Sequence, residues 1–107
     1  MTAEPPRLSA RFWVDAWLAR ARVEMLPAYV LAHGDDTAGA ILVKCATLDG
    51  QARLWQRVLS PQGRRWDVLA EGAEADVDAA IARARGFDPD LWVLEVEDRG
   101  GRALLDD

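Results

Sequence analysis

The stretch HGDDTAGAILVKCA, residues 33–46, contains the only histidine and the only cysteine of this 107-residue chain. A histidine in contact with a cysteine could activate the thiol as a nucleophile, which requires a separation of about 3 Å. Apolar segments on both sides of DDTA predict a hairpin, in which His33 pairs near Ala40 or Ile41. Cys45 then lies roughly 13–16 Å from His33, at about 3.3 Å per residue. This spacing argues against a catalytic pair and favours a buried Cys45.

The turn of that hairpin contains two carboxylates, Asp35 and Asp36, between Gly34 and Gly39. They could hold a metal only with ligands from elsewhere, and aspartates in turns usually accept hydrogen bonds from their own backbone. The two glycines lack the spacing of a phosphate-binding loop. We therefore interpret HGDDTAG as a hairpin loop, and we expect no metal and no cofactor.

The densest acidic segment, DPDLWVLEVED at residues 88–98, is a second candidate for chemistry. On a strand, Glu95 and Glu97 share one face at a separation of about 6.6 Å. Two carboxylates at this distance could share a metal or act as an acid–base pair. A solvated face, or ion pairs with arginines of a neighbouring strand, is the commoner meaning of such a pattern.

Arg65 and Trp66 form a third candidate, because an arginine beside an aromatic ring can recognise a phosphate or a carboxylate. The chain has five tryptophans, and such aromatic residues near arginines are typical both of binding hot spots and of small cores. The candidate binding residues are therefore Arg65, Trp66, Asp88, Asp90, Trp92, Glu95 and Glu97.

A helix over residues 10–24, capped by Ser9, is the first element that must position these side chains. One side of this helix is a core-facing stripe that includes Val14 and Trp17. The opposite side is also apolar, and a helix buried on both sides is hard to accommodate in so short a chain. This second side is either a face that contacts a partner or a second copy, or a part of the core or a set of scattered apolar surface residues. Its candidate interface residues are Phe12, Trp13, Ala16 and Val23.

Strands are predicted at residues 28–34, 39–48, 52–59, 64–70 and 91–97, with a second helix at residues 73–85 and a further short strand at residues 102–105. Asp49 and Gly50 are typical of a two-residue hairpin turn, which would place Lys44 opposite Trp55 in a cation–π contact. Tight hairpins favour antiparallel pairing. We expect one compact α+β domain over residues 1–107, frayed at residues 1–7, in the order α-β-β-β-β-α-β. Its antiparallel sheet of four to six strands carries both helices on one face.

Composition and charge narrow the classes of function. The net charge of −5 divides into +3 over residues 1–66 and −8 over residues 67–107. An acidic domain is repelled by phosphate backbones, which argues against nucleic acid, whereas the uneven charge suits a basic partner or head-to-tail self-association. No apolar run approaches the ~20 residues that span a bilayer, and the N-terminus does not resemble a signal peptide. With one cysteine and no disulfide, we expect a cytoplasmic protein without membrane contact.

Several segments are similar to those of a bacterial family catalogued as domain of unknown function 1491. They are RLSARFWVDAWLARA, HGDDTAGAILVK with the following LDG, the RRW step, and FDPDLWVLEVEDRGGR. The resemblance covers about residues 7–105 and is most specific in DPDLW and E-x-E-D-R. It implies one compact domain from a bacterial cytoplasm. It implies no reaction, so no catalytic residue is carried over.

The two-sided first helix, the tryptophans, the uneven charge and the scarcity of catalytic side chains favour a non-enzymatic module. It would bind a protein partner or self-associate as a homodimer. The alternative is a small-molecule or metal-binding domain, with or without enzymatic activity, that uses Arg65, Trp66 and the carboxylates of residues 88–98. The sequence specifies no small-molecule ligand.

Overall fold

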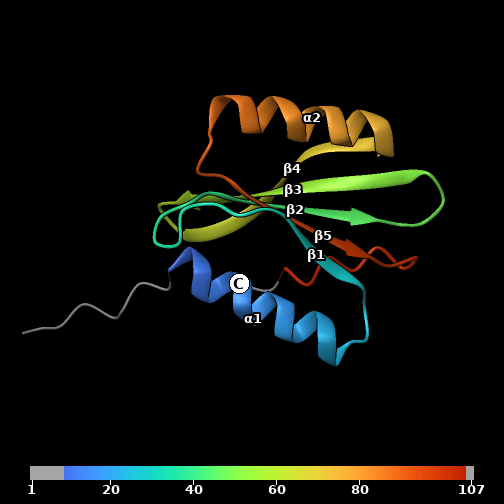
Figure 1. Cartoon of the computed structure of the whole chain (residues 1–107), viewed down its shortest axis with the longest axis horizontal. Coiled ribbons are helices and arrows are strands. Elements are labelled where there is room, and N and C mark those ends of the chain that lie inside the picture. The colour runs from blue at the N-terminus through green and yellow to red at the C-terminus, as the bar shows by residue number, and fades with distance from the viewer. Residues whose placement is uncertain (1–8, 106–107) are drawn as a thin grey trace, which may run out of the picture.

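The computed structural model describes residues 9–105, so the fraying expected at residues 1–7 lies outside the described residues. Two helices and five strands follow one another in the predicted order (Figure 1). They are α1 (Ala10–Val23), β1 (Ala28–Ala32), β2 (Ile41–Ala46), β3 (Gln51–Ser60), β4 (Gly63–Ala73), α2 (Glu74–Phe87) and β5 (Trp92–Glu97). The predicted α+β class is confirmed. The predicted strand at residues 102–105 is wrong, because that segment has no regular structure.

The five strands form one sheet in the order β1-β5-β2-β3-β4. Neighbouring strands are antiparallel except β2 and β5, which pair in parallel, so the sheet is mixed rather than wholly antiparallel. The last strand of the chain therefore lies between the first two. The predicted hairpin between β1 and β2 is wrong, because these strands are not neighbours. The segment between them instead passes across the end of β5.

The helices lie on opposite faces of the sheet, and not on one face as predicted (Figure 1). β2 is buried along its whole length. Ile41, Val43 and Cys45 pack with α1, while Leu42 packs with Val77 and Ile81 of α2. A strand that is apolar on both faces requires a cover on each side, and one helix supplies each cover. The prediction that Cys45 is buried is confirmed.

The loop at residues 33–40 joins three elements through its backbone. The Asp35 amide donates to the Asp90 carbonyl at 3.0 Å, and the Trp92 indole Nε1 donates to the Asp35 carbonyl at 2.8 Å. The Arg11 amide at the start of α1 donates to the Asp36 carbonyl at 2.9 Å. The aspartate side chain also bonds its own turn, since Asp35 Oδ2 accepts from the Ala38 amide at 2.8 Å. HGDDTAG is thus a structural junction between α1, β2 and β5.

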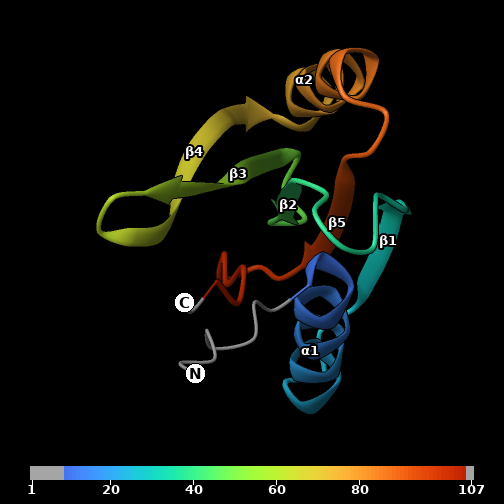
Figure 2. The same cartoon turned by 90° about the vertical axis from the view of Figure 1, so that its left-hand side faces the viewer.

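α1 begins as predicted, because Ser9 Oγ accepts a hydrogen bond from the Phe12 amide at 3.1 Å. The face of α1 that meets the sheet includes Trp17, whose indole donates to the Ala103 carbonyl at 2.9 Å and so holds the C-terminal segment. The β3–β4 hairpin extends away from the rest of the sheet (Figure 2), and its Trp66 packs on Trp13 with ring centroids 5.2 Å apart. This contact closes the core on the α1 side.

Two glycines of the loop are required by close packing. A Cβ at Gly34 would lie 2.4 Å from the Asp90 carbonyl oxygen, and one at Gly39 would lie 2.7 Å from the same atom. A Cβ at Gly86, near the end of α2, would meet nothing within 4 Å. The backbone atoms at the loop cannot move without breaking the junction.

We expect Gly34→Ala and Gly39→Ala each to lower the free energy of unfolding by about 2 kcal/mol or more, because overpacking forces backbone shifts. Gly86→Ala is the matched control and should raise stability by about 0.5 kcal/mol, since alanine favours helix. Urea denaturation followed by circular dichroism measures all three. Equal stability of Gly34→Ala and Gly86→Ala would contradict this account of the loop.

Candidate functional site

The predicted binding pair Arg65 and Trp66 does not form one site. Arg65 is exposed on β4, where its Nε donates to Asp67 Oδ1 at 3.1 Å. Trp66, the next residue on the strand, points to the other face of the sheet and packs on Trp13. Because neighbouring residues of a strand alternate in direction, the ring of Trp66 does not lie against the guanidinium of Arg65.

Asp88, Asp90 and Trp92 shape the turn between α2 and β5. The Asp88 carboxylate accepts from the Asp90 amide at 3.0 Å, as aspartates in turns commonly do. Trp92 is buried, and the His33 ring packs against it with centroids 4.1 Å apart. His33 in turn bonds Asp36 Oδ1 at 2.9 Å. The side chains of Asp88, Trp92 and His33 are thus engaged in contacts that stabilise the fold.

Glu95 and Glu97 share one face of β5, but each contacts a different group. Glu95 Oε1 lies 3.1 Å from Nζ of Lys44, and Glu97 Oε1 accepts from the Tyr29 hydroxyl at 3.4 Å. The negative charge of Glu97 raises the pKa of Tyr29. Among residues 9–105, no three histidine, cysteine or acidic side chains are placed to hold a metal ion. The structure therefore does not gather the seven predicted binding residues into one site.

The strongest electrostatic feature is one that the sequence analysis missed. Lys44, the only lysine, is buried between β2 and α2 and ion-paired with three carboxylates. Its Nζ lies 2.7 Å from Glu74 Oε2, 2.8 Å from Asp78 Oδ1 and 3.1 Å from Glu95 Oε1. An ammonium has three donors, so all of its hydrogen-bonding capacity is used. Lys44 thereby links the first turns of α2 to the sheet.

The predicted contact between Lys44 and Trp55 is wrong by one residue of register. Lys44 lies opposite Leu54, and Trp55 lies opposite Val43. The Thr47 amide donates to the Gln51 carbonyl at 3.2 Å, so the turn contains the three residues 48–50 rather than two, which shifts the pairing by one position. A shift of one residue moves a side chain to the other face of the sheet. The ring of Trp55 instead lies beneath the guanidinium of Arg53, whose Cζ is 5.7 Å from the ring centroid.

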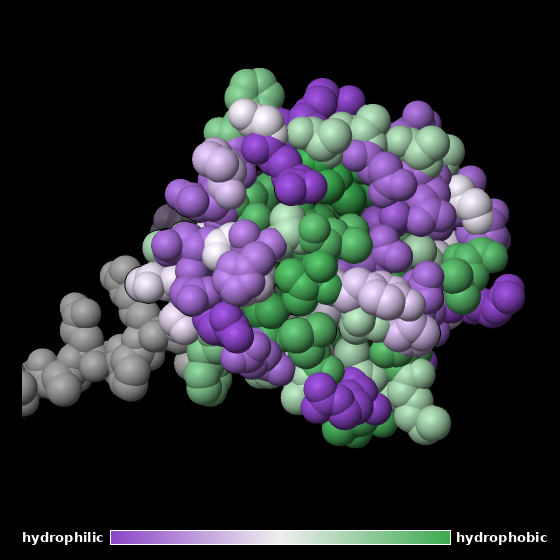
Figure 3. Space-filling model, viewed as in Figure 1, coloured by the Kyte–Doolittle hydropathy of each residue, from purple (hydrophilic) through white to green (hydrophobic). Residues whose placement is uncertain are grey.

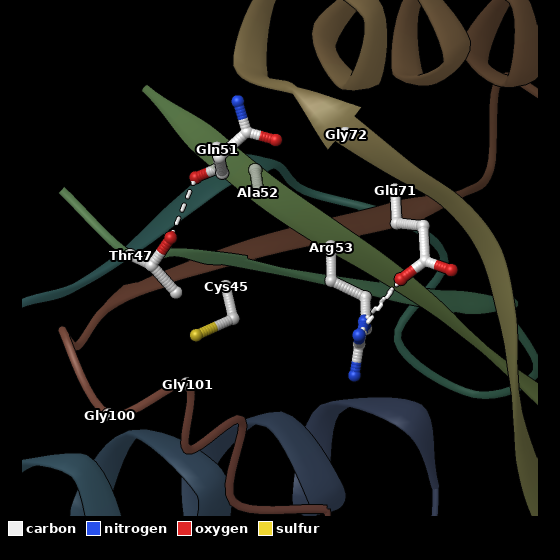
Figure 4. A pocket seen from close by; sticks show the side chains of 9 residues that line it. All are labelled: Cys45, Thr47, Gln51, Ala52, Arg53, Glu71, Gly72, Gly100 and Gly101. Atoms are coloured by element: carbon white, nitrogen blue, oxygen red, sulfur yellow. Dashed lines mark hydrogen bonds and ion pairs between the residues drawn. The ribbon is translucent and has the colours of Figure 1, made fainter. Parts of the chain in front are cut away.

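A cavity of about 460 Å³ lies between the β2–β3–β4 end of the sheet and the C-terminal segment (Figure 4). Its walls include Arg53, whose Nε and Nη2 both lie 2.9 Å from Glu71 Oε2, and Gly101 of the C-terminal segment. Cys45 also lines the cavity. Burial raises the pKa of the Cys45 thiol, and the charge of Asp98 adds to this effect, which favours the protonated form.

The β1 edge of the sheet is the most apolar exposed surface among the strands. Tyr29, Val30 and Leu31 are 47%, 41% and 44% exposed. In the space-filling view, an apolar band crosses the middle of the molecule over β1 (Figure 3). Within the described chain, no strand pairs with the outer side of β1. This edge therefore presents uncovered backbone donors and acceptors with apolar side chains beside them, and its register with β5 shifts between Val30 and Ala32.

The four residues predicted as an interface on the first helix divide between core and surface. Phe12, Ala16 and Val23 are exposed, and Phe12 and Val23 are 58% and 79% exposed. Trp13 is buried against Trp66 and contributes to the core instead. In the part of the chain that the structure describes, neither helix is long and apolar enough to cross a membrane.

Comparison with known proteins decides the family. The family model described as a protein of unknown function, DUF1491, matches residues 8–106. The chain belongs to the DUF1491 family. A crystal structure of a family member from Caulobacter crescentus CB15 is similar, with 40% identity, coverage of 94% of this chain and 97% of that one, and a TM-score of 0.87. Among proteins with curated functions, none matches this chain.

Two solution structures agree with this result. An NMR structure of a DUF1491 protein from the same Caulobacter strain has 40% identity, covers 96% of each chain and has a TM-score of 0.86. A protein from A. tumefaciens has 29% identity, covers 86% of each chain and has a TM-score of 0.74. The resemblance noted in the sequence is thereby confirmed.

We expect Lys44→Met to lower the free energy of unfolding by about 3 kcal/mol, because it leaves three carboxylates close together without their cation. The double variant Lys44→Met/Glu95→Gln should lose clearly less than the sum of the two single variants, since Glu95 is the most buried of the three partners. Urea denaturation of the four proteins completes the cycle. Additive losses would contradict a direct interaction.

The same cluster predicts a dependence on alkaline pH. Burial lowers the pKa of Lys44, but hydrogen bonds to Asp78, Glu74 and Glu95 outweigh burial and hold it above the ordinary 10.5. The stability that Lys44 contributes is therefore complete below about pH 10.5 and is lost as the pH rises further. The stability difference between wild type and Lys44→Met should be constant from pH 7 to pH 9 and should shrink above pH 10.5. A difference that falls already between pH 7 and pH 9 would contradict this assignment.

Proposed function

We propose that this protein is a cytoplasmic, non-enzymatic interaction module that binds a protein strand along the free edge of β1. The observation that carries this proposal is the contrast between the two edges of the sheet. β4 carries the charged residues Arg64, Arg65, Asp67 and Glu71, which discourage pairing with another chain. β1, with the sequence AYVLA, carries no charge. An uncharged edge suits addition of a further strand.

The state of the reactive side chains supports a role without catalysis. Cys45 is buried and held protonated, and Lys44 is enclosed by three carboxylates. The ion pairs of Lys44 and the burial of Cys45 stabilise the fold. Surface binding needs none of these groups, whereas a nucleophile or a general base would have to be free to reach a substrate.

The exposed stripe of α1 is a second apolar surface, but it specifies its partner less closely than β1 does. Phe12, Ala16 and Val23 offer apolar contact without hydrogen-bonding groups. A sheet edge adds backbone donors and acceptors at fixed spacing, which only another strand can match. We therefore assign partner binding to β1 and use the α1 stripe as an internal comparison.

Photo-crosslinking in living bacterial cells tests this assignment. A photoreactive amino acid replaces Leu31 on β1, Phe12 on α1 or Leu69 on β4, which are all exposed apolar positions. We expect covalent adducts to protein at position 31, and background levels at positions 12 and 69. Exposed substitutions should leave stability within about 0.5 kcal/mol, and circular dichroism of each variant checks this. Equal labelling at positions 31 and 69 would contradict the proposed function.

A further inference from the structure

We infer that the segment that occupies the β1 edge is a basic strand, with lysine or arginine side chains on the face that α2 covers and apolar side chains on the opposite face. This inference rests on the proposed function and adds to it the chemistry of the partner. Two observations carry it. The outer backbone groups of β1 are few, and the side chains on the two faces of this edge differ in charge.

The backbone of β1 offers only a short ladder. The Glu97 amide donates to the Pro27 carbonyl at 2.9 Å, so residues 27 and 97 form a hydrogen-bonded position of the β1–β5 pair. Such positions alternate along an antiparallel pair, so Ala28 and Val30 direct their N–H and C=O groups outward. The register with β5 shifts between Val30 and Ala32, which ends the regular ladder. With so few backbone bonds, the side chains decide which strand binds there.

The face of the sheet that α2 covers is acidic close to β1. The cluster around Lys44 contains three carboxylates for its one cation. Glu97 adds a fourth carboxylate on the same face of β5, so this group carries an excess of three negative charges. The arginines of α2 occupy the second half of that helix, which leads into the start of β5, whereas Glu95 and Glu97 lie toward the end of β5. The negative charge is therefore concentrated beside the first residues of β1.

Tyr29 is the side chain of β1 that borders this charge. It pairs with Glu95, and its hydroxyl donates to Glu97 Oε1 at 3.4 Å, so it lies on the α2 side of the sheet. The charge of Glu97 raises the pKa of Tyr29, and burial and the charge of Glu95 add to this effect, as expected for a hydroxyl in a negative potential.

A docked antiparallel strand would place one side chain directly opposite Tyr29. Because Tyr29 is at a hydrogen-bonded position with β5, it would form a non-hydrogen-bonded pair with the outer strand, in which side chains approach most closely. The outer strand would lie about 10 Å from β5, at twice the usual spacing of neighbouring strands. An arginine or a lysine at this position can contact the Tyr29 ring and extend toward Glu97.

The opposite face of the same edge is apolar. Val30 pairs with Leu94 of the core beneath α1, and Ala28 and Leu18 pack against that core. Since the side chains of a strand alternate between two faces, every second residue of a docked strand would lie on this apolar face. The edge therefore matches a strand of alternating basic and apolar residues. Acidic residues in place of the basic ones would meet carboxylates of like charge, which repel them.

Two designed peptides with blocked termini, VRVRVR and VEVEVE, test this preference for charge. They share the alternation and differ in the sign of the charge. At about 150 mM salt, which screens distant charges, we expect wild type to bind VRVRVR at least tenfold more tightly than VEVEVE. Two-dimensional NMR spectra recorded during the titration give both affinities. Shifts of the Ala28 and Val30 amides identify the β1 edge as the binding surface.

Charge reversal at Glu97 is the decisive variant. Glu97→Lys should reduce the tenfold preference for VRVRVR to less than threefold, and Glu97→Gln should give an intermediate value. Glu71→Lys makes the same change of charge on β4, at the other edge of the sheet, and should retain the preference. Because the two lysine variants have the same net charge, a difference between them cannot come from the overall charge of the protein. Circular dichroism checks that each variant is folded.

The outcomes separate this inference from the proposed function. A preference for VRVRVR with shifts at Ala28 and Val30, lost in Glu97→Lys and kept in Glu71→Lys, supports the inference. Equal affinities, no binding of either peptide, binding without shifts at these amides, or a preference that survives Glu97→Lys overturns it. If photo-crosslinking at position 31 still gives adducts in that case, the proposed function stands with a partner strand of different chemistry. If position 31 gives no adducts, both fail.

Discussion

The arrangement of this protein depends on the pairing of β2 and β5, two central strands that are apolar on both faces. Val43 and Leu94 face α1, whereas Leu42 and Val93 face α2. Because neither face can be left in water, the sheet needs one helix on each side. The parallel β2–β5 pair also requires the chain to cross from one end of the sheet to the other, which α2 accomplishes between β4 and β5. The position of β5 then displaces β1 to the outside.

The same pairing explains the two polar features of the interior. Lys44 and Glu95 are paired positions of β2 and β5, on the face that α2 covers. A buried lysine at that position needs acidic partners, and Glu74 and Asp78 on successive turns of α2 supply two more. The loop at residues 33–40 crosses the end of β5 and bonds Asp90 and Trp92. The side chains that resembled a reactive site in the sequence therefore maintain the central strand pair.

Local features of the fold could be predicted from the sequence, whereas its long-range pairings could not. The Ser9 cap, the apolar stripe of α1 and the burial of Cys45 follow from patterns within a few residues. The insertion of β5 between β1 and β2 joins segments 51 to 68 residues apart, and apolar periodicity reports which face is buried but not which strand is the neighbour. The role of Lys44 was missed because a three-residue turn in place of a two-residue turn shifts the register by one position. Trp13 was assigned to an interface because the position of Trp66 on the β3–β4 hairpin was not visible in the sequence.

The central claim is that the β2–β5 pairing leaves β1 as an uncharged edge that takes up another strand. Amide hydrogen exchange of Val30, measured by NMR in the isolated protein and in a bacterial lysate that contains its partners, tests it most directly. The Val30 amide points away from β5, because residues 27 and 97 are a hydrogen-bonded position and such positions alternate along an antiparallel pair. It should exchange rapidly in the isolated protein and become protected in the lysate, while the amides of β4 do not change. A Val30 amide that exchanges at the same rate in the isolated protein and in the lysate would contradict the account.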